Sequence, residues 1–312
     1  HELQYLNNNQ RLESILIDCG LFQGIEAESE EGDNVGDSLL ATQIPFEINH
    51  IKALVVTHVH IDHVGRIPHL LAKGFKGPIY CSEPSAKLLP LVLEDAVKIG
   101  FTRNKQLIEK FLSHIEKQII PVKYGKWQQV SEQLKIKLKP AGHILGSAYI
   151  TCKLTPNVED TPLLTNALLQ EQNTTDHSPK VARIERNVIR EWINKVSSNN
   201  PNRKPKPKTI IFSGDLGAPY TPILKAPKSP WKCDVLILES TYGNKNHESR
   251  KDRRERLKTV LEKALQNKGN VLIPAFSIGR TQELLYELEE IAYRAAGTSI
   301  MSGAKHRVHQ AK

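Results

Sequence analysis

The chain has 312 residues, of which 39% are hydrophobic and 25% are charged, and its formal net charge is +9. This length accommodates one large α/β domain and part of a second, and the composition is typical of a globular protein. No apolar run approaches the ~20 residues of a membrane-spanning helix, so we expect no membrane association. The four cysteines lie far apart without a CxxC pair, which argues against a disulfide framework and favours a reducing, cytoplasmic location.

The positive charge is unevenly distributed along the chain. Residues 101–140 contain nine basic and three acidic side chains, and residues 180–208 and 249–312 are also basic, whereas residues 1–100 are acidic. A local basic excess is compatible with a polyanionic partner, because contacts with phosphates release counterions. Solvated helix faces explain any single stretch about equally well.

The first half of the chain is predicted to alternate strands with helices. In chain order we expect strands at 2–6, 12–19, 51–57 and 78–81, helices at 86–99 and 104–118, and exposed, alternating strands at 133–139 and 147–154. The helix at 104–118 is expected to place Leu107, Phe111, Leu112 and Ile115 on one face. Strands that alternate with helices predict an α/β layered fold.

The second half begins with a polar stretch. Residues 155–208 end in a run rich in Asn, Pro and Lys, and we interpret them as a surface insertion, partly disordered, with one candidate helix at 181–196. Strands at 209–213 and 235–239, a helix at about 247–266, a strand at 270–274 and a helix at 281–295 are expected to follow. No element is predicted after Gly297.

The most informative motif is the run His58-Val59-His60-Ile61-Asp62-His63. In an extended chain His58 and His60 point to the same side, and Asp62 and His63 follow at the turn. One loop can thus offer two imidazoles to one metal and a carboxylate–imidazole pair to a second, which suits zinc, with manganese or iron as alternatives. A lone histidine is usually a satisfied core or surface residue, but this run is expected by chance only roughly 0.0006 times at this composition.

Two later loops carry further candidate ligands. His143 lies in the glycine-flanked segment AGHILGS, and Asp215 lies in SGDLG, just past a predicted buried strand. A carboxylate that emerges between glycines at the carboxyl end of a strand commonly delivers a ligand into a crevice. Alone, each residue is about as well explained as an ordinary loop His or turn Asp; after the first motif, both indicate one composite metal site.

These motifs, in this order and with Asp18 at the end of the second predicted strand, resemble those of the metallo-β-lactamase superfamily. The resemblance implies an αββα sandwich with two metal ions, which we expect to be Zn²⁺. It assigns His58, His60 and His143 to the first metal, Asp62 and His63 to the second, and Asp215 to both. It also implies that Asp18 orients ligands without binding metal.

Residues 238–243 (LESTYG) and 269–284 resemble the beginning of the β-CASP region of RNA-processing members, such as bacterial ribonuclease J and the eukaryotic pre-mRNA 3′-end endonuclease. The resemblance divides the chain into a metallo-β-lactamase domain at 1–237 and the start of a β-CASP cap domain at 238–312. The family's preceding strand and two later histidines have no counterpart, so we expect a chain truncated at both ends, with an incomplete second metal site.

The function implied by this resemblance is hydrolysis of RNA phosphodiester bonds by a zinc-activated hydroxide, with Asp62 and Asp215 as the catalytic carboxylates. Glu239 is a candidate acid behind the ligands, and Arg66, Ser277 and Arg280 are candidate phosphate contacts, with helix capping and surface charge as the alternative. The rival functions are a small-ester or thioester hydrolase on the same fold and a non-catalytic RNA-binding fragment. The oligomeric state stays open.

Overall fold

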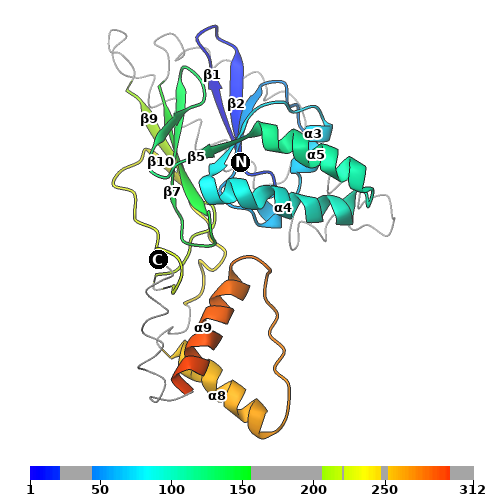
Figure 1. Cartoon of the computed structure of the whole chain (residues 1–312). Coiled ribbons are helices and arrows are strands. Elements are labelled where there is room, and N and C mark those ends of the chain that lie inside the picture. The colour runs from blue at the N-terminus through cyan, green and yellow to red at the C-terminus, as the bar shows by residue number, and fades with distance from the viewer. Residues whose placement is uncertain (22–43, 156–205, 220, 247–251, 296–312) are drawn as a thin grey trace.

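The computed structural model describes residues 1–21, 44–155, 206–219, 221–246 and 252–295, and its main body contains two five-stranded sheets (Figure 1). The first sheet has the order β1-β2-β3-β4-β5. Its strands are β1 (Glu2–Leu6), β2 (Leu12–Ile17), β3 (Ile51–Val55), β4 (Ile79–Ser82) and β5 (Ile119–Val122). β1 pairs antiparallel with β2, whereas β2 to β5 are parallel, so the carboxyl ends of β2 and β3 open at the same edge.

The second sheet has the order β10-β9-β8-β7-β6. Its strands are β6 (Trp127–Gln129), β7 (Leu134–Pro140), β8 (Ala148–Leu154), β9 (Lys208–Phe212) and β10 (Val235–Ile237). β6 to β9 are antiparallel, and β10 pairs parallel with β9. Inward side chains of both sheets, among them Ile17, Val55 and Ile150, form one buried core between the layers.

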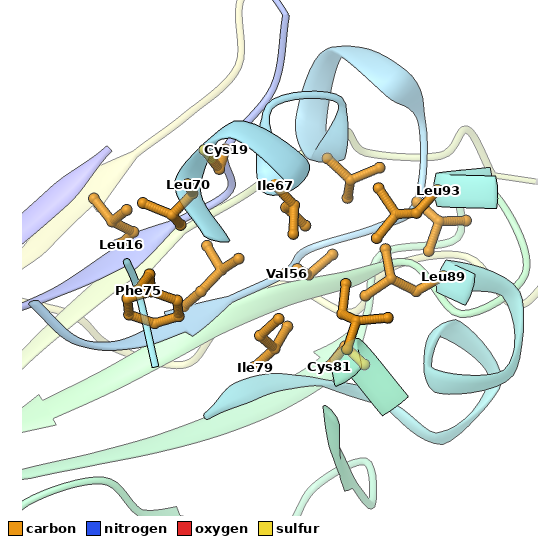
Figure 2. Close-up of a cluster of buried hydrophobic side chains, with 14 of the residues drawn as sticks. Leu16, Cys19, Val56, Ile67, Leu70, Phe75, Ile79, Cys81, Leu89 and Leu93 are labelled. Atoms are coloured by element: carbon orange, nitrogen blue, oxygen red, sulfur yellow. The ribbon is translucent and has the colours of Figure 1, made fainter. Parts of the chain in front are cut away.

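A second core packs helices onto the outer face of the first sheet. The helices are α2 (Ile61–Val64), α3 (Ile67–Ala72), α4 (Glu83–Gly100) and α5 (Lys105–Gln118). Leu89 and Leu93 of α4 and Leu70 of α3 are fully buried against Leu54 and Ile79 of the sheet, in the cluster drawn in Figure 2. Burial of one such side chain contributes about 1.5–3 kcal/mol. Among the described residues, the helices that cover the sandwich lie on this side (Figure 1).

A helical pair extends from the sandwich in Figure 1 and consists of α8 (Arg253–Gln266) and α9 (Arg280–Ala295). Glu287 of α9 holds α8, because its carboxylate accepts hydrogen bonds from Arg253 at 2.7 Å and from Arg254 at 2.6 Å. The segment between the two helices returns to the sandwich, where Ile278 packs against the first core. None of the helices in the described residues is long and apolar enough to span a membrane.

Most predicted elements are confirmed within one to three residues, and the α/β layered fold is confirmed. Asn104 caps α5, since its side chain accepts hydrogen bonds from two backbone N–H groups of the first turn. The predicted apolar face of α5 was wrong in one member: Leu107 is 53% exposed, while Ile108 is buried with Ile115. The insertion at 155–208, with its helix at 181–196, lies almost entirely outside the described residues.

Two further predictions were wrong. The strand at 270–274 is absent: no strand among the described residues pairs with this segment, and Leu272 is 95% exposed. β-branched residues favour a strand only where a partner supplies the ladder hydrogen bonds. β8 does not alternate like an exposed strand, because six of its seven residues are buried. β7 does alternate, with Leu134, Ile136 and Leu138 fully buried between partly exposed lysines.

Candidate metal centre

The predicted ligands gather where several loops leave the sandwich. His58 and His60 follow β3, and Asp62 and His63 lie in the short helix α2. His143 comes from the β7–β8 loop, and Asp215 follows β9 of the same sheet. Every residue that the sequence assigned to a metal therefore lies in one of two adjoining groups: His58, His60, His143 and Asp215 form the first, and Asp62, His63 and Asp215 form the second.

Glycines allow these loops to approach one another closely. Gly214, which precedes Asp215, has a φ of 52°, and a Cβ there would lie 2.7 Å from Cβ of Thr57. Gly20 is more restricted still, because its Cβ would lie 1.4 Å from the carbonyl oxygen of Asp62. The backbone N–H of Ala148 donates to the carbonyl of Thr57 at 2.8 Å, so the two sheets are joined directly beside the site.

The ligand atoms of the first group lie close enough together to share one metal ion. Nδ1 of His60 lies 3.1 Å from Nε2 of His58 and 3.1 Å from Nε2 of His143. Oδ2 of Asp215 lies 3.5 Å from Nε2 of His143 and 3.9 Å from Nε2 of His58. Zinc–nitrogen bonds of ~2.0–2.1 Å in a tetrahedron place ligand atoms roughly 3.3–3.4 Å apart. Three nitrogens and one carboxylate oxygen at these separations fit a zinc ion.

The second group uses the other oxygen of the same carboxylate. Oδ1 of Asp215 lies 3.2 Å from Nε2 of His63, and Oδ2 of Asp62 lies 3.5 Å from that nitrogen. Asp215 thus presents one oxygen to each group, as a bridging carboxylate does. Three protein ligands form this second group among the described residues.

Hydrogen bonds fix the orientation of three of the four histidines through the ring nitrogen that faces away from the group. Nδ1 of His58 lies 3.2 Å from Oγ1 of Thr57, and Nδ1 of His63 lies 2.8 Å from Oδ2 of Asp18. Nε2 of His60 lies 3.3 Å from the backbone carbonyl of Ile278. With these nitrogens as donors, the opposite nitrogen of each ring keeps a free lone pair when the ring is neutral, which is the tautomer that a metal ligand requires.

Asp18 holds this arrangement together. Its Oδ1 accepts from the backbone N–H of Thr57 at 2.7 Å, and its Oδ2 accepts from the Thr57 hydroxyl at 2.7 Å as well as from His63. Asp18 adopts a φ of 62°, in the left-handed region that non-glycine residues rarely occupy. The strained backbone turns the carboxylate back towards the loop after β3, where it contacts one candidate ligand and the residue before another.

The charges of the site divide its histidines by protonation state. Burial, reinforced by the neighbouring His63, lowers the pKa of His58 to about 2, so this ring is neutral at pH 7. For His63 burial acts in the same direction, but hydrogen bonds to Asp18 and Asp215 outweigh it and raise the pKa to about 10. Burial likewise opposes ionisation of Asp215, yet its contact with His63 dominates and lowers its pKa to about 2. At pH 7 His63 is therefore protonated between the carboxylates of Asp18 and Asp215, whereas His58 is neutral.

Glu239 lies behind Asp215 and connects it to the end of β10. Its Oε1 accepts from the backbone N–H of Leu216 at 2.6 Å, and its own N–H donates to Oγ of Ser213 at 2.9 Å. Both contacts are made to residues of the loop that carries Asp215. Glu239 therefore supports the conformation of this loop.

The three candidate phosphate contacts differ in their surroundings. Arg66 donates from Nε to the carbonyl of Gly20 at 2.6 Å, so its guanidinium fixes the loop after β2. Nη1 of Arg280 lies 2.9 Å from Oε2 of Glu283, and the Arg280 side chain is 65% exposed. The carbonyl of Ser277 accepts from Nε2 of Gln282 at 2.9 Å. Of the three, Arg66 is the one with a clear structural role.

The loop before α9 covers the first ligand group, a feature that the sequence did not reveal. Besides the Ile278 carbonyl at Nε2 of His60, the ring of Phe276 lies 5.8 Å from the His60 ring. A Cβ on Gly279 would lie 2.5 Å from Cγ2 of Ile144, next to His143. A backbone carbonyl 218 positions away leaves no residue-type signature, so only the fold could identify this contact. Thr57 was also missed, although its position before His58 could have indicated it.

Comparisons with known proteins agree with this geometry. Residues 11–148 match the family described as the metallo-beta-lactamase superfamily. The chain is 28% identical over 282 residues to Ribonuclease TTHA0252 of Thermus thermophilus, covering 90% of this chain and 50% of that protein. It is 28% identical over 281 residues to the transcription termination factor FttA of Methanococcus maripaludis, and the match covers 88% of this chain and 35% of that protein. Integrator complex subunit 11 of Danio rerio is 26% identical over 285 residues, and the match covers 88% of this chain and 38% of that protein. The chain therefore spans half or less of the length of these relatives.

Proposed function

We propose that this chain, which belongs to the metallo-β-lactamase superfamily and is related to its β-CASP RNA-processing members, binds two zinc ions and hydrolyses phosphodiester bonds of RNA. The observation that carries the proposal is the carboxylate of Asp215, whose two oxygens face two separate groups of ligand atoms. Imidazole and carboxylate donors at these separations suit zinc. The relative named as a ribonuclease supports RNA as the substrate class.

When bound, a pair of such ions supplies a water of lowered pKa as the nucleophile and offsets the charge that develops on the phosphoryl oxygens. The chain's own residues prepare the site for this chemistry. Asp62 lies beside Asp215 with its side chain 30% exposed, so its carboxylate can accept a hydrogen bond from the attacking water and orient it. The buried, neutral ring of His58 offers its Nε2 lone pair without first losing a proton.

Asp18, Thr57 and Ile278 act through the ligands. Each accepts a hydrogen bond from the ring nitrogen that faces away from the ligand group, on His63, His58 and His60 respectively. Such contacts fix the ring orientation and raise the basicity of the ligand nitrogen. The carbonyl of Ile278 belongs to the segment resembling the β-CASP region, so the position of that segment and the orientation of His60 are linked.

The free thiols of the chain support the reducing, cytoplasmic environment that we expected from the spacing of the cysteines. Cys19, Cys81 and Cys152 are buried, unpaired thiols. Burial raises the pKa of Cys81 and of Cys152 to about 12, which suppresses the reactive thiolate. Their role is therefore packing.

Cleavage of a labelled single-stranded RNA by the zinc-loaded chain tests the proposal. His60→Ala removes the nitrogen at the centre of the first group and should reduce cleavage to the level of chelator-treated protein. His114→Ala, which changes an exposed histidine of α5, should cleave like the wild type. Turnover of a small ester or thioester without RNA cleavage would favour the rival hydrolase. RNA binding that survives chelation, with no cleavage by zinc-loaded protein, would favour a non-catalytic fragment.

A further inference from the structure

The outer face of the second sheet carries four lysines, Lys135, Lys137 and Lys139 of β7 and Lys153 of β8, which together we call the lysine face. The alternation of β7 places its leucine and isoleucine side chains in the core between the sheets and its lysines on the opposite side. Lys135 is paired in register with Lys153 on the neighbouring strand, so these two side chains project from the same face.

The lysine face is not neutralised within the described part of the chain. Lys135 and Lys153 lie directly opposite each other, and like charges in this position destabilise a sheet. Burial and the neighbouring Lys139, Lys135 and Lys153 lower the pKa of Lys137. No described carboxylate forms an ion pair with any of the four, although Lys208 on the adjacent strand pairs with Asp234. Repulsion of this kind is relieved by an anionic partner.

Aromatic rings are interleaved with these cations. Nζ of Lys137 lies 4.3 Å from the centroid of the Trp127 ring, and Nζ of Lys135 lies 5.1 Å from it. Nζ of Lys139 lies 5.7 Å from the centroid of Tyr149. Trp127 is on the edge strand β6 and is 41% exposed. Cations that track a phosphate chain, beside an exposed ring on which a base can stack, are the features of single-stranded nucleic-acid binding.

The row of lysines on β7 runs towards the end of the strand from which the loop that carries His143 leaves. Lys139 lies near the carboxyl end of β7, four residues before His143, and Lys137 and Lys135 follow in the direction away from the site. Alternate residues of a strand are about 6.6–6.8 Å apart, so the three amines form a regular row. An extended polyanion that leaves the metal centre along β7 can contact them in succession.

We propose that the lysine face binds the sugar–phosphate backbone of single-stranded RNA beyond the scissile bond, with Trp127 as a stacking platform for a base. This inference rests on RNA as the substrate of the proposed function and adds a second contact surface outside the metal centre. Lys135, Lys137 and Lys139 contact phosphates, so they contribute affinity without reading sequence.

The test measures binding of labelled oligouridylate to the 312-residue chain by fluorescence anisotropy, in chelator so that no cleavage occurs. The variant carries Lys135→Gln, Lys137→Gln and Lys139→Gln together. The control carries Lys105→Gln, Lys110→Gln and Lys117→Gln, which remove the same charge from exposed positions of α5. Loss of three phosphate contacts lowers the slope of log affinity against log salt by about 2, so the affinity ratio between about 50 and 200 mM salt should shrink about twentyfold.

The expected result is weaker RNA binding and a shallower salt dependence for the β7 variant, with the α5 control close to the wild type. Trp127→Ala should weaken binding without changing the salt slope, because stacking releases no counterions. Equal binding by the β7 variant and the control would overturn the inference. So would a β7 variant that binds RNA normally but no longer binds vesicles of anionic phospholipid. Because RNA binding is measured without metal, its outcome tests the lysine face independently of whether the zinc-loaded chain cleaves RNA.

Discussion

Replacement of Asp18 by asparagine tests how the site is built, because Asp18 contacts one candidate ligand and the residue preceding another. Its carboxylate accepts three hydrogen bonds at 2.7–2.8 Å, from the Thr57 N–H, the Thr57 hydroxyl and Nδ1 of His63. An asparagine amide has the same shape but only one acceptor oxygen, so its NH₂ group must face at least one of these donors. A buried donor without a partner costs about 1–3 kcal/mol.

The main effect is expected on the second metal. Loss of the carboxylate removes one of the two anionic partners that raise the pKa of His63 to about 10, and it releases the ring from its orientation. Changes to such supporting contacts typically weaken metal binding by about 10–100-fold, or about 1.4–2.7 kcal/mol. Zinc affinities measured by chelator competition should show a weaker second site and a nearly unchanged first site in Asp18→Asn.

A matched control separates this effect from a general change of charge. Asp95→Asn makes the same substitution at an exposed position of α4 and should leave both zinc affinities unchanged. Wild-type affinity for two zinc ions in Asp18→Asn would refute the reasoning, since Asp18 would then have no influence on His63. Equal weakening of both sites would also refute it, because the first group contacts Asp18 only through Thr57.

Three further predictions concern stability. In Gly20→Ala the added Cβ meets the Asp62 carbonyl at 1.4 Å, so the loop must move and urea unfolding should show a loss of at least about 2–3 kcal/mol together with weakened zinc binding. Leu89→Ala leaves a cavity at a fully buried position and should lower the free energy of unfolding by about 2–5 kcal/mol with zinc binding retained. In metal-free protein, His63 has a folded pKa of about 10 against an ordinary value of 6.5, so its contribution to stability is complete below pH 6.5 and disappears as pH rises towards 10. The midpoint of urea unfolding should therefore fall more steeply over this pH range for the wild type than for Asp18→Asn. Parallel pH profiles of the two proteins would contradict the role of Asp18 in raising the pKa of His63.

The candidate metal ligands could be selected from the sequence because each lies in a short motif whose chemistry is local. His58, His60, Asp62 and His63 fall within six residues, and His143 and Asp215 are flanked by glycines that mark tight loops. The motif order then matched a known family, which supplied the pairing of ligands with metals. The structure brings these residues together without exception.

The elements that were missed or wrong share a physical reason: their state depends on partners distant in sequence. β5 is a four-residue strand containing Pro121, which is tolerated because β5 lies at the edge of its sheet. Residues 270–274 have the composition of a strand, but no strand in the described part of the chain pairs with them. The contact of Ile278 with His60 uses a backbone carbonyl, which every residue has. None of these three facts is encoded in a local pattern.

The number of zinc ions per chain, measured by elemental analysis after zinc loading and gel filtration, tests the central claim most directly. Asp215 presents one oxygen to each of two ligand groups, so the account predicts about two ions per chain in the wild type and about one in His63→Ala, which removes a ligand of the second group only. One ion in both proteins, or none in the wild type, would contradict the assignment of a two-metal centre.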